Sequence, residues 1–274
     1  MAFVDEIYDS AHRRHPLVEE FLVLVKYRDL VAQFVSSSIK TRYKRSLLGV
    51  VWTLLNPLLT MIVLTVVFSN VFRFSVEDYP VYVLSGLIMW SFFSSTTNGA
   101  MQGMLLSGGL LQRIYVPKSV FAVSAAGTGL VNLGLSLIPL FGITLLLGVR
   151  ITPAVLVMPA AVLLMALFAL GIGLALTTVA VYFADMLPVY EVILTIWMYA
   201  TPIIYPPEIL PPQWAWLLKI NPMYHLVNIF RRPLFEGVVP GTMEWAFAAL
   251  SALLAFLLGG LIFTARSNEY AYRV

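Results

Sequence analysis

Two long apolar runs of this chain meet at the stretch Gly108-Gly109-Leu110-Leu111-Gln112-Arg113-Ile114-Tyr115-Val116-Pro117-Lys118-Ser119. Its Arg113 and Lys118 are the only charged side chains between Tyr79 and Val149. Apolar runs of about 20 or more residues require a lipid bilayer around them. A short cationic segment between two such runs is either a plain turn or a surface that a soluble partner grips.

The composition of the whole chain is typical of a membrane protein. Of its 274 residues, 60% are hydrophobic and 11% are charged, and the mean hydropathy is +0.88. A soluble domain carries about 25% charged residues. The sequence contains no cysteine, which excludes disulfides and thiol chemistry. Residues 1–20 lack an apolar core, so they do not resemble a cleaved signal peptide.

Residues 1–46 predict a cytoplasmic N-terminus that contains an amphipathic helix over about 17–45. Apolar side chains recur at helical spacing from Leu24 to Val35, and polar side chains occupy the other faces. The helix ends in a basic cluster of Lys40, Arg42, Lys44 and Arg45. This pattern favours a helix that lies along an anionic membrane surface. The alternative is a solvated helix that merely leads into the first span.

The remaining sequence predicts an all-α integral membrane domain with six transmembrane helices over residues 47–265. The spans are expected at about 47–72, 79–105, 120–148, 153–183, 189–204 and 245–265. A proline-rich stretch at about 205–243 contains apolar pieces too short to cross a bilayer. Short re-entrant helices at the outer face are therefore expected between the fifth and sixth spans. Residues 266–274 read as a polar cytoplasmic tail.

Basic residues predict the orientation of these spans. With the N-terminus inside, the inner segments hold 12 of the 17 Lys and Arg residues and the outer segments hold the other 5. An excess of Lys and Arg marks the cytoplasmic side of a membrane protein. Both termini and the cationic segment between spans two and three are therefore predicted to lie in the cytoplasm.

Several classes of chemistry are missing from the sequence. It contains no G-x-x-x-x-G-K-[ST] phosphate loop, and neither H-E-x-x-H nor G-x-S-x-G occurs. The histidines, His12, His15 and His225, are not spaced as a metal cluster. Glu191 is the one ionisable residue near membrane depth, whereas an ion-coupled carrier is expected to hold several. We therefore expect a transport subunit with no catalytic, cofactor or metal site.

Aromatic residues are the functional candidates within the spans. Their ring faces are apolar and suit the apolar faces of sugars, and the polar tips of Tyr and Trp form hydrogen bonds. Interfacial belts and helix packing are the alternative explanation, although Trp90 and Trp197 lie toward mid-span. The predicted channel residues are Trp52, Tyr82, Trp90, Phe92, Phe93, Trp197 and Tyr199.

Four ordered motifs resemble the permeases of polysaccharide-exporting type 2 ABC transporters. They are Ile39-Lys40-Thr41-Arg42-Tyr43-Lys44-Arg45-Ser46-Leu47-Leu48-Gly49 followed by Trp52-Thr53-Leu54-Leu55-Asn56-Pro57; Leu111-Gln112-Arg113-Ile114-Tyr115-Val116-Pro117-Lys118; Tyr199-Ala200-Thr201-Pro202-Ile203-Ile204-Tyr205; and Ile220-Asn221-Pro222-Met223-Tyr224. The resemblance covers nearly the whole chain. Many members carry an Arg-Asp pair before the fifth span, where this chain has Ala184-Asp185, so a contact that needs the arginine is in doubt.

The resemblance implies a homodimeric permease with twelve spans. Two copies of a separate ATP-binding cassette protein would dock below it and would bind the ATP and Mg, while this chain holds no cofactor. The substrate would be a lipid-linked polysaccharide of the O-antigen, capsule or teichoic acid type. It would leave across the cytoplasmic (inner) membrane of a bacterium or archaeon, with membrane lipids and no nucleic acid as further contacts.

The resemblance also assigns roles to two sets of residues. The predicted coupling helix that receives the movement of the partner ATPase contains Gln112, Arg113, Ile114, Tyr115, Val116, Pro117 and Lys118. The predicted external gate contains Tyr205, Asn221, Pro222, Tyr224 and His225. Two other functions remain open: a type 2 ABC exporter of a small lipophilic molecule, and a membrane enzyme acting on polyprenyl-linked sugars. For such an enzyme, Asp185 and Glu191 are the only candidate pair of acids.

Overall fold

The structure, a computed structural model, describes residues 16–44, 49, 51–68, 78–111, 113, 116–183 and 185–270. Within these ranges the regular elements are all helical, which confirms the expected all-α membrane fold. The α-helices are α1 (Pro16–Lys26), α2 (Arg28–Tyr43), α3 (Val51–Val66), α4 (Tyr79–Leu105), α5 (Gly108–Leu111), α6 (Ser119–Leu146), α7 (Met158–Tyr182), α8 (Met186–Ala200), α9 (Ala215–Ile220), α10 (Pro222–Phe235) and α11 (Thr242–Arg266). Four short 3-10 helices are η2 (Pro153–Val157), η3 (Pro207–Ile209), η4 (Pro212–Trp214) and η5 (Ser267–Glu269).

Three segments in the described part are long and apolar enough to cross a bilayer. They are α6, the η2–α7 unit and α11, and they coincide with the third, fourth and sixth predicted spans. Helix α4 begins and ends at the predicted residues and has 27 residues, or about 40 Å at 1.5 Å per residue. Helices α3 and α8 are shorter apolar helices. The first, second and fifth membrane crossings therefore remain predictions.

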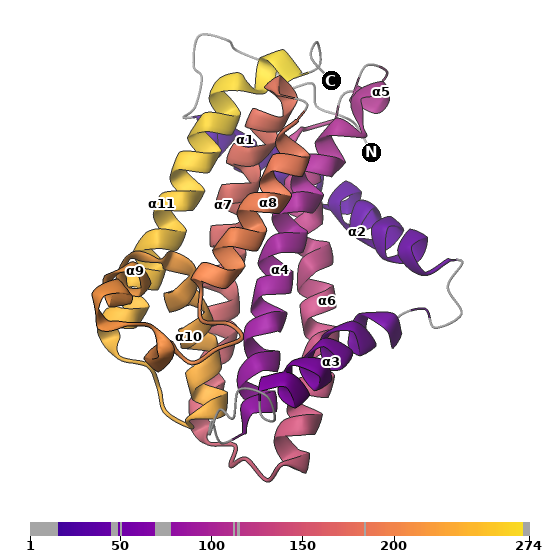
Figure 1. Ribbon diagram of the computed structural model, residues 1–274. Coiled ribbons are helices and arrows are strands. Elements are labelled where there is room, and N and C mark those ends of the chain that lie inside the picture. The colour runs from indigo at the N-terminus through magenta and orange to yellow at the C-terminus, as the bar shows by residue number, and fades with distance from the viewer. Residues whose placement is uncertain are drawn as a thin grey trace.

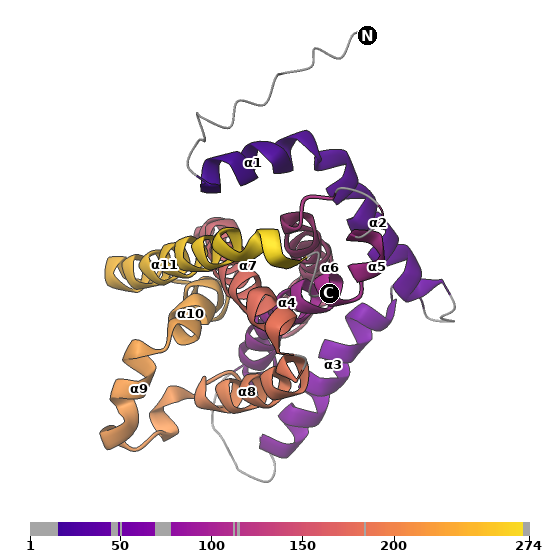
Figure 2. The same cartoon turned by 90° about the horizontal axis from the view of Figure 1, so that it is seen from above.

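Helix α4 is the central element of the bundle. It packs against α3, α6, α7, α8 and α10, and Figure 2 shows it surrounded by these helices. Most of its side chains are buried, including the small polar Ser85, Thr96 and Thr97. A helix that is covered on all sides needs no single apolar stripe. This position explains why its hydrophobic residues are spread around its circumference.

Helices α7 and α11 touch backbone to backbone. A Cβ atom on Gly171 would collide with the backbone of Ala255, and one on Gly259 would collide with the backbone of Gly171. Small residues allow membrane helices to approach this closely. Gly173 allows a less tight approach of α7 to α4, because a Cβ on Gly173 would lie 3.3 Å from the Cβ of Ala100. Gly171 and Gly173 therefore both allow a neighbouring helix to approach α7 closely.

The N-terminal region forms two helices where a single one was predicted. The break falls at Tyr27, and α1 packs on α11 whereas α2 packs on α6. The ring of Phe34 meets that of Phe121 edge-on, with centroids 5.5 Å apart. Because the two halves lie against different parts of the bundle, the chain has to turn between them (Figure 2).

The two ends of the bundle collect different segments (Figure 1). The end that contains α1 also contains α5 and the C-terminal end of α11. The opposite end contains the start of α4, the connection from α6 to η2 and the end of α10. This grouping matches the predicted topology, in which the first set is cytoplasmic. We refer to these as the inner and outer ends, and their placement in a membrane remains a prediction.

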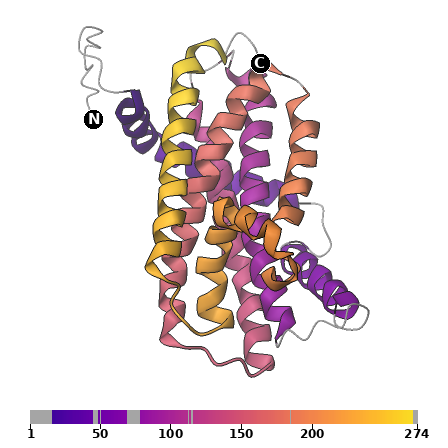
Figure 3. The same ribbon diagram turned by 60° about the vertical axis from the view of Figure 1, so that its left-hand side comes forward.

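The stretch between α8 and α11 contains two helices that are too short to span a bilayer. Figure 3 shows α9 crossing the side of the bundle, while α10 runs between α4 and α11. Six apolar side chains of α10 are buried: Met223, Leu226, Val227, Ile229, Phe230 and Leu234. Helix α10 is therefore part of the core of the protein and not a surface loop.

Candidate functional site

The predicted coupling segment at the inner end is described only in part. Arg113 is exposed, Val116 and Pro117 are buried, and Lys118 is half-buried. Gln112, Ile114 and Tyr115 lie outside the described residues, as does Ala184. The described part thus places the exposed Arg113 before the buried Val116 and Pro117. The coupling role itself remains a prediction.

Lys118 attaches this segment to the C-terminal end of the chain. Its ammonium group donates a hydrogen bond to the carbonyl of Ser267 and lies 5.7 Å from the centre of the Tyr270 ring. Burial lowers the pKa of Lys118, and the nearby carboxylate of Glu20 opposes that shift. The contact therefore joins the start of α6 to η5 and the residue that follows it.

Tyr270 is the residue that holds the C-terminal segment in place. Its side chain is fully buried, and its hydroxyl shares a hydrogen bond of 2.6 Å with that of Thr178. The same hydroxyl lies 3.2 Å from the carbonyl of Phe263. Burial raises the pKa of Tyr270 to about 12. The sequence pattern predicts only a polar tail here; the one available sign was an aromatic residue a few positions beyond the last span.

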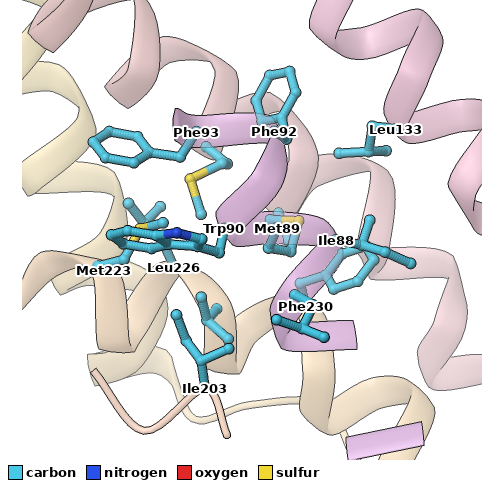
Figure 4. Close-up of a cluster of buried hydrophobic side chains, with 14 of the residues drawn as sticks. Ile88, Met89, Trp90, Phe92, Phe93, Leu133, Ile203, Met223, Leu226 and Phe230 are labelled. Atoms are coloured by element: carbon cyan, nitrogen blue, oxygen red, sulfur yellow. The ribbon is translucent and has the colours of Figure 1, made fainter. Parts of the chain in front are cut away.

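The predicted channel aromatics do not form one surface. Trp90, Phe93 and Trp197 meet Phe168 in a cluster with ring centroids 5.3–6.4 Å apart, spacings that are typical of packed aromatic pairs. Figure 4 shows Trp90 and Phe93 among the apolar side chains of α4 and α10. Trp90 and Phe93 are at most 7% exposed. This cluster attaches α8 to α4 and α7.

The other predicted channel residues lie elsewhere. Phe92 is buried on the opposite side of α4, toward Leu133 (Figure 4). Tyr82 is buried near the outer end. Only Trp52 on α3 and Tyr199 on α8 are well exposed, at 53% and 64%. These two are the members of the set that are free to contact something outside the protomer.

Asn221 connects the end of α8 to the start of α10. Its side-chain oxygen accepts hydrogen bonds from the Trp197 indole and from the Met223 backbone N–H, each at 3.0 Å. Its amide nitrogen donates to the hydroxyl of Thr201 at 2.9 Å. Asn is a preferred N-cap, and Pro222 occupies the first helical position where its missing N–H has no cost. The Asn-Pro pair of the predicted gate thus starts α10 and ties it to α8.

Arg231 of α10 holds the loop that follows α8. It donates to the carbonyls of Pro202 at 2.9 Å and Ile203 at 3.1 Å. Its guanidinium also lies 3.7 Å from the centre of the Tyr82 ring. The side chain is 3% exposed, so these contacts replace the water that a buried cation loses. The charge count assigned Arg231 to the outer segments by its place in the sequence and gave no sign of this burial.

Two tyrosines of α4 bind the same loop. The Tyr82 hydroxyl lies 3.0 Å from the carbonyls of both Pro202 and Tyr205. The Tyr79 hydroxyl donates to the carbonyl of Ile204 at 2.6 Å. Side chains from α4 and α10 therefore satisfy the backbone carbonyls of a loop that is largely buried, as such groups require. We call residues 201–206, whose backbone carbonyls accept these hydrogen bonds, the loop anchor.

The remaining predicted gate residues lie within the loop anchor or on α10. The hydroxyl of Tyr205 donates to the carbonyl of Tyr199 at 2.8 Å. His225 lies 2.9 Å from the carbonyl of Lys219, and its ring packs on Phe247. The ring of Tyr224 meets that of His225 with centroids 5.3 Å apart. The structure thus brings the five predicted gate residues to one region of α8, α9 and α10.

Comparison with known proteins identifies the family. The sequence pattern of the ABC-2 type transporter family matches residues 30–235. The chain is 31% identical to the O-antigen export system permease protein RfbA of Myxococcus xanthus over 251 residues, which cover 90% of this chain and 96% of that protein. It is 24% identical over 243 residues to the polysialic acid transport protein KpsM of Escherichia coli, covering 84% and 90%.

A third relative is the capsule polysaccharide export inner-membrane protein CtrC of Neisseria meningitidis serogroup A. It is 26% identical over 253 residues, which cover 90% of this chain and 94% of that protein. The matches extend through α3–α10 and include the loop anchor and the segment between α4 and α6. This chain is a member of the ABC-2 type transporter family.

Proposed function

We propose that this chain is the permease subunit of an ATP-driven exporter that moves a lipid-linked polysaccharide outward across the cytoplasmic membrane. One observation carries the proposal: the Myxococcus O-antigen export permease is 31% identical and is matched over 96% of its length. Relatives that are named for polysialic acid transport and for capsule polysaccharide export match over similar lengths. The polymer class is therefore proposed as O-antigen or capsule, with teichoic acid as a related possibility.

The energy for export would come from a separate ATP-binding cassette protein that binds ATP and Mg. The chain has no phosphate loop. Its inner end presents the exposed Arg113 beside α5, followed by the Lys118 anchor. A partner that pushes on this segment would move α4 and α6 directly, because the segment connects them. Two copies of the partner would match two copies of the permease.

A pair of permeases would enclose the path of the polymer. Helix α8 has 15 residues, or about 22 Å of helix, which is too short to cross a bilayer by itself. One of its faces is strongly exposed, with Val192 at 60% and Ile196 at 64%. Helices α3 and α8 lie on the same side of α4 (Figure 2). We assign this side, with Trp52 and Tyr199, to the dimer contact and the channel wall.

The loop anchor would form the outer exit. Its position beside the Asn221 cap couples it to α8, so a movement of α8 in the dimer would reach the exit. The buried aromatic cluster of Trp90, Phe93 and Trp197 would then make α8 move together with α4. This arrangement connects the proposed channel wall with the proposed gate.

The test is reconstitution in proteoliposomes with an ATP-binding cassette partner protein. ATP-dependent appearance of a lipid-linked polysaccharide in the outer leaflet is expected, and it should need both proteins. Replacement of Arg113 by Glu should reduce coupling between ATP hydrolysis and transport while the permease still inserts. Turnover of a lipid-linked sugar by the permease alone would instead indicate an enzyme. ATP-dependent export of a small lipophilic compound, without polymer, would favour the other exporter class.

A further inference from the structure

A polar cavity of about 340 Å³ lies between α4, α10, the start of α11 and the loop at η3. Its lining includes Tyr82, Glu208, Tyr224, Asn228, Arg231 and Glu244. Ligand pockets in proteins usually measure about 300–1,000 Å³. The cavity is therefore large enough for a small ligand, and the loop anchor forms one of its walls.

Helix α10 supplies five of the eleven lining residues, more than any other element. Tyr224, Asn228, Arg232 and Phe235 follow one another at steps of three or four residues, which places them in a row along one side of the helix. The opposite side of α10 is buried in the core of the bundle. A re-entrant helix that only filled space would not need a continuous polar and aromatic row toward a cavity.

Two buried polar atoms of the lining have no hydrogen-bond partner in the described part of the chain. They are Nε of Arg231 and Oε2 of Glu244. Arg231 is 97% buried, so bulk water does not reach this donor freely. Neither atom has appreciable accessible surface, so a ligand in the cavity would instead meet the polar groups of the α10 row, such as Asn228.

A sugar hydroxyl suits such a lining because it can donate and accept a hydrogen bond at once. The amide of Asn228 offers a further donor and acceptor within the same row. The rings of Tyr224 and Phe235 provide apolar faces for the C–H side of a sugar ring. The chemistry of the cavity is thus that of a hydroxyl-rich ligand with an apolar face.

The charge of the lining separates neutral from acidic ligands. Three carboxylates, Glu208, Glu236 and Glu244, face two guanidinium groups, Arg231 and Arg232. Arg232 is already bound to Glu236 and Glu244, each at 2.8 Å. Two nitrogen atoms of Arg231 already donate hydrogen bonds to the carbonyls of the loop. The cavity therefore carries a net charge of −1, which disfavours a phosphate or a carboxylate-bearing sugar.

We propose that this cavity is a binding site for a neutral sugar unit of the exported polymer as it passes the outer end of the permease. The inference rests on the proposed function, and it adds a site and a charge preference. It places the sugar contact on α10 and beside the loop anchor. An exporter with this site favours polymers of neutral sugars over polymers of acidic sugars.

The test uses the permease together with its ATP-binding partner in lipid nanodiscs, and measures saturation-transfer NMR with defined probes. Maltotriose, mannotriose and chitotriose serve as neutral probes, and a dimer of sialic acid serves as the acidic probe. At least one neutral probe is expected to bind and the acidic probe is not. Asn228→Leu should weaken neutral binding at least about fivefold, whereas Glu208→Gln, which removes the net negative charge of the lining, should let the acidic probe bind. Glu191→Gln, an exposed carboxylate outside the cavity, should leave the binding of both kinds of probe unchanged.

Several results would overturn this assignment. Binding of none of the neutral probes, equal binding of the sialic acid dimer, or unchanged binding in both cavity variants would each do so. Co-purification with the ATP-binding partner verifies that Asn228→Leu is folded, and Glu208 is exposed on a loop, so its substitution does not disturb the core. Normal polymer export by a variant that no longer binds sugar would reject the site while leaving the proposed exporter function intact. Failure of ATP-dependent export in the unmodified complex would instead reject the function.

Discussion

Arg231 shows how one side chain can hold an outer loop in place. It uses both Nη groups on the carbonyls of Pro202 and Ile203 and places its guanidinium on the Tyr82 ring. The planar fork of arginine suits several acceptors at once, whereas lysine presents a single compact charge. Gly86 leaves the space that this fork occupies, because a Cβ there would collide with it. The geometry is therefore specific for arginine at this position.

Arg231→Lys is expected to destabilise the permease and loosen residues 201–206. A buried carbonyl without a partner costs about 1–3 kcal/mol, so a clear fall in melting temperature should accompany faster hydrogen exchange in this loop. Arg232→Lys is the matched control, because its salt bridges are about 30% exposed and such pairs contribute about 0–1 kcal/mol. Equal effects of the two substitutions would contradict the role of Arg231.

The buried hydroxyl of Tyr270 predicts that the stability of the folded protein depends on pH. Its pKa is raised to about 12 in the folded protein because burial disfavours the phenolate, and the ordinary value is 10.0. The folded state therefore holds the proton more tightly than the unfolded state. Its contribution to stability is complete below pH 10 and is lost as the pH rises toward 12. Between pH 9 and pH 11 the loss should be about 1 kcal/mol.

The measurement is the difference in melting temperature between the unmodified permease and Tyr270→Phe. At pH 9 the unmodified protein should be more stable, because the variant loses the hydrogen bond to Thr178. At pH 11 this advantage should shrink toward zero. Lys118, Tyr182 and Glu269 are present in both proteins, so their titration cancels in the difference. An advantage that stays constant from pH 9 to pH 11 would show that the Tyr270 hydroxyl does not titrate in this range.

At the scale of elements, the long helices could be predicted from the sequence and their partners could not. Helix α4 was expected at residues 79–105 and is found there, because an apolar run bounded by turn residues determines both ends. The break at Tyr27 depends instead on which helix each half meets. The burial of Arg231 likewise depends on carbonyls about 30 residues earlier in the chain. Local patterns record neither kind of contact, so both were missed.

The α7–α11 contact predicts a difference between two glycines. Gly171→Ala should destabilise the permease strongly, because the new Cβ would meet the backbone of α11 at Ala255. Gly142→Ala on α6 should be neutral or slightly stabilising, since a Cβ there meets nothing within 4 Å and alanine favours helix. Thermal unfolding in detergent compares the two variants directly. Similar melting temperatures would mean that α7 and α11 can separate at little cost.

At the scale of the whole molecule, one side of the protomer is left uncovered. Helix α8 packs on only part of its surface and keeps an exposed row that includes Val192, Ile196 and Tyr199. The face of α8 that points toward the bundle is fixed by the aromatic cluster with Trp90 and Phe93. A helix that is too short to cross a bilayer gains most when its exposed apolar face meets protein. The sequence did not show how two copies of the chain meet. The spacing of apolar residues shows which face of a helix is apolar, but it does not show what covers that face.

The absence of cysteine from the chain makes this dimer arrangement directly testable. A single cysteine at Ile196, which is 64% exposed on α8, should form a disulfide between two copies in native membranes after mild oxidation. A cysteine at Leu163, which is 69% exposed on α7, should remain monomeric because α7 packs mainly against α11 and α4. If Leu163→Cys cross-links as readily as Ile196→Cys, the contact reflects random collision in the membrane. If only Leu163→Cys cross-links, the two copies meet through another face, and Trp52 and Tyr199 would then face lipid and not the polymer.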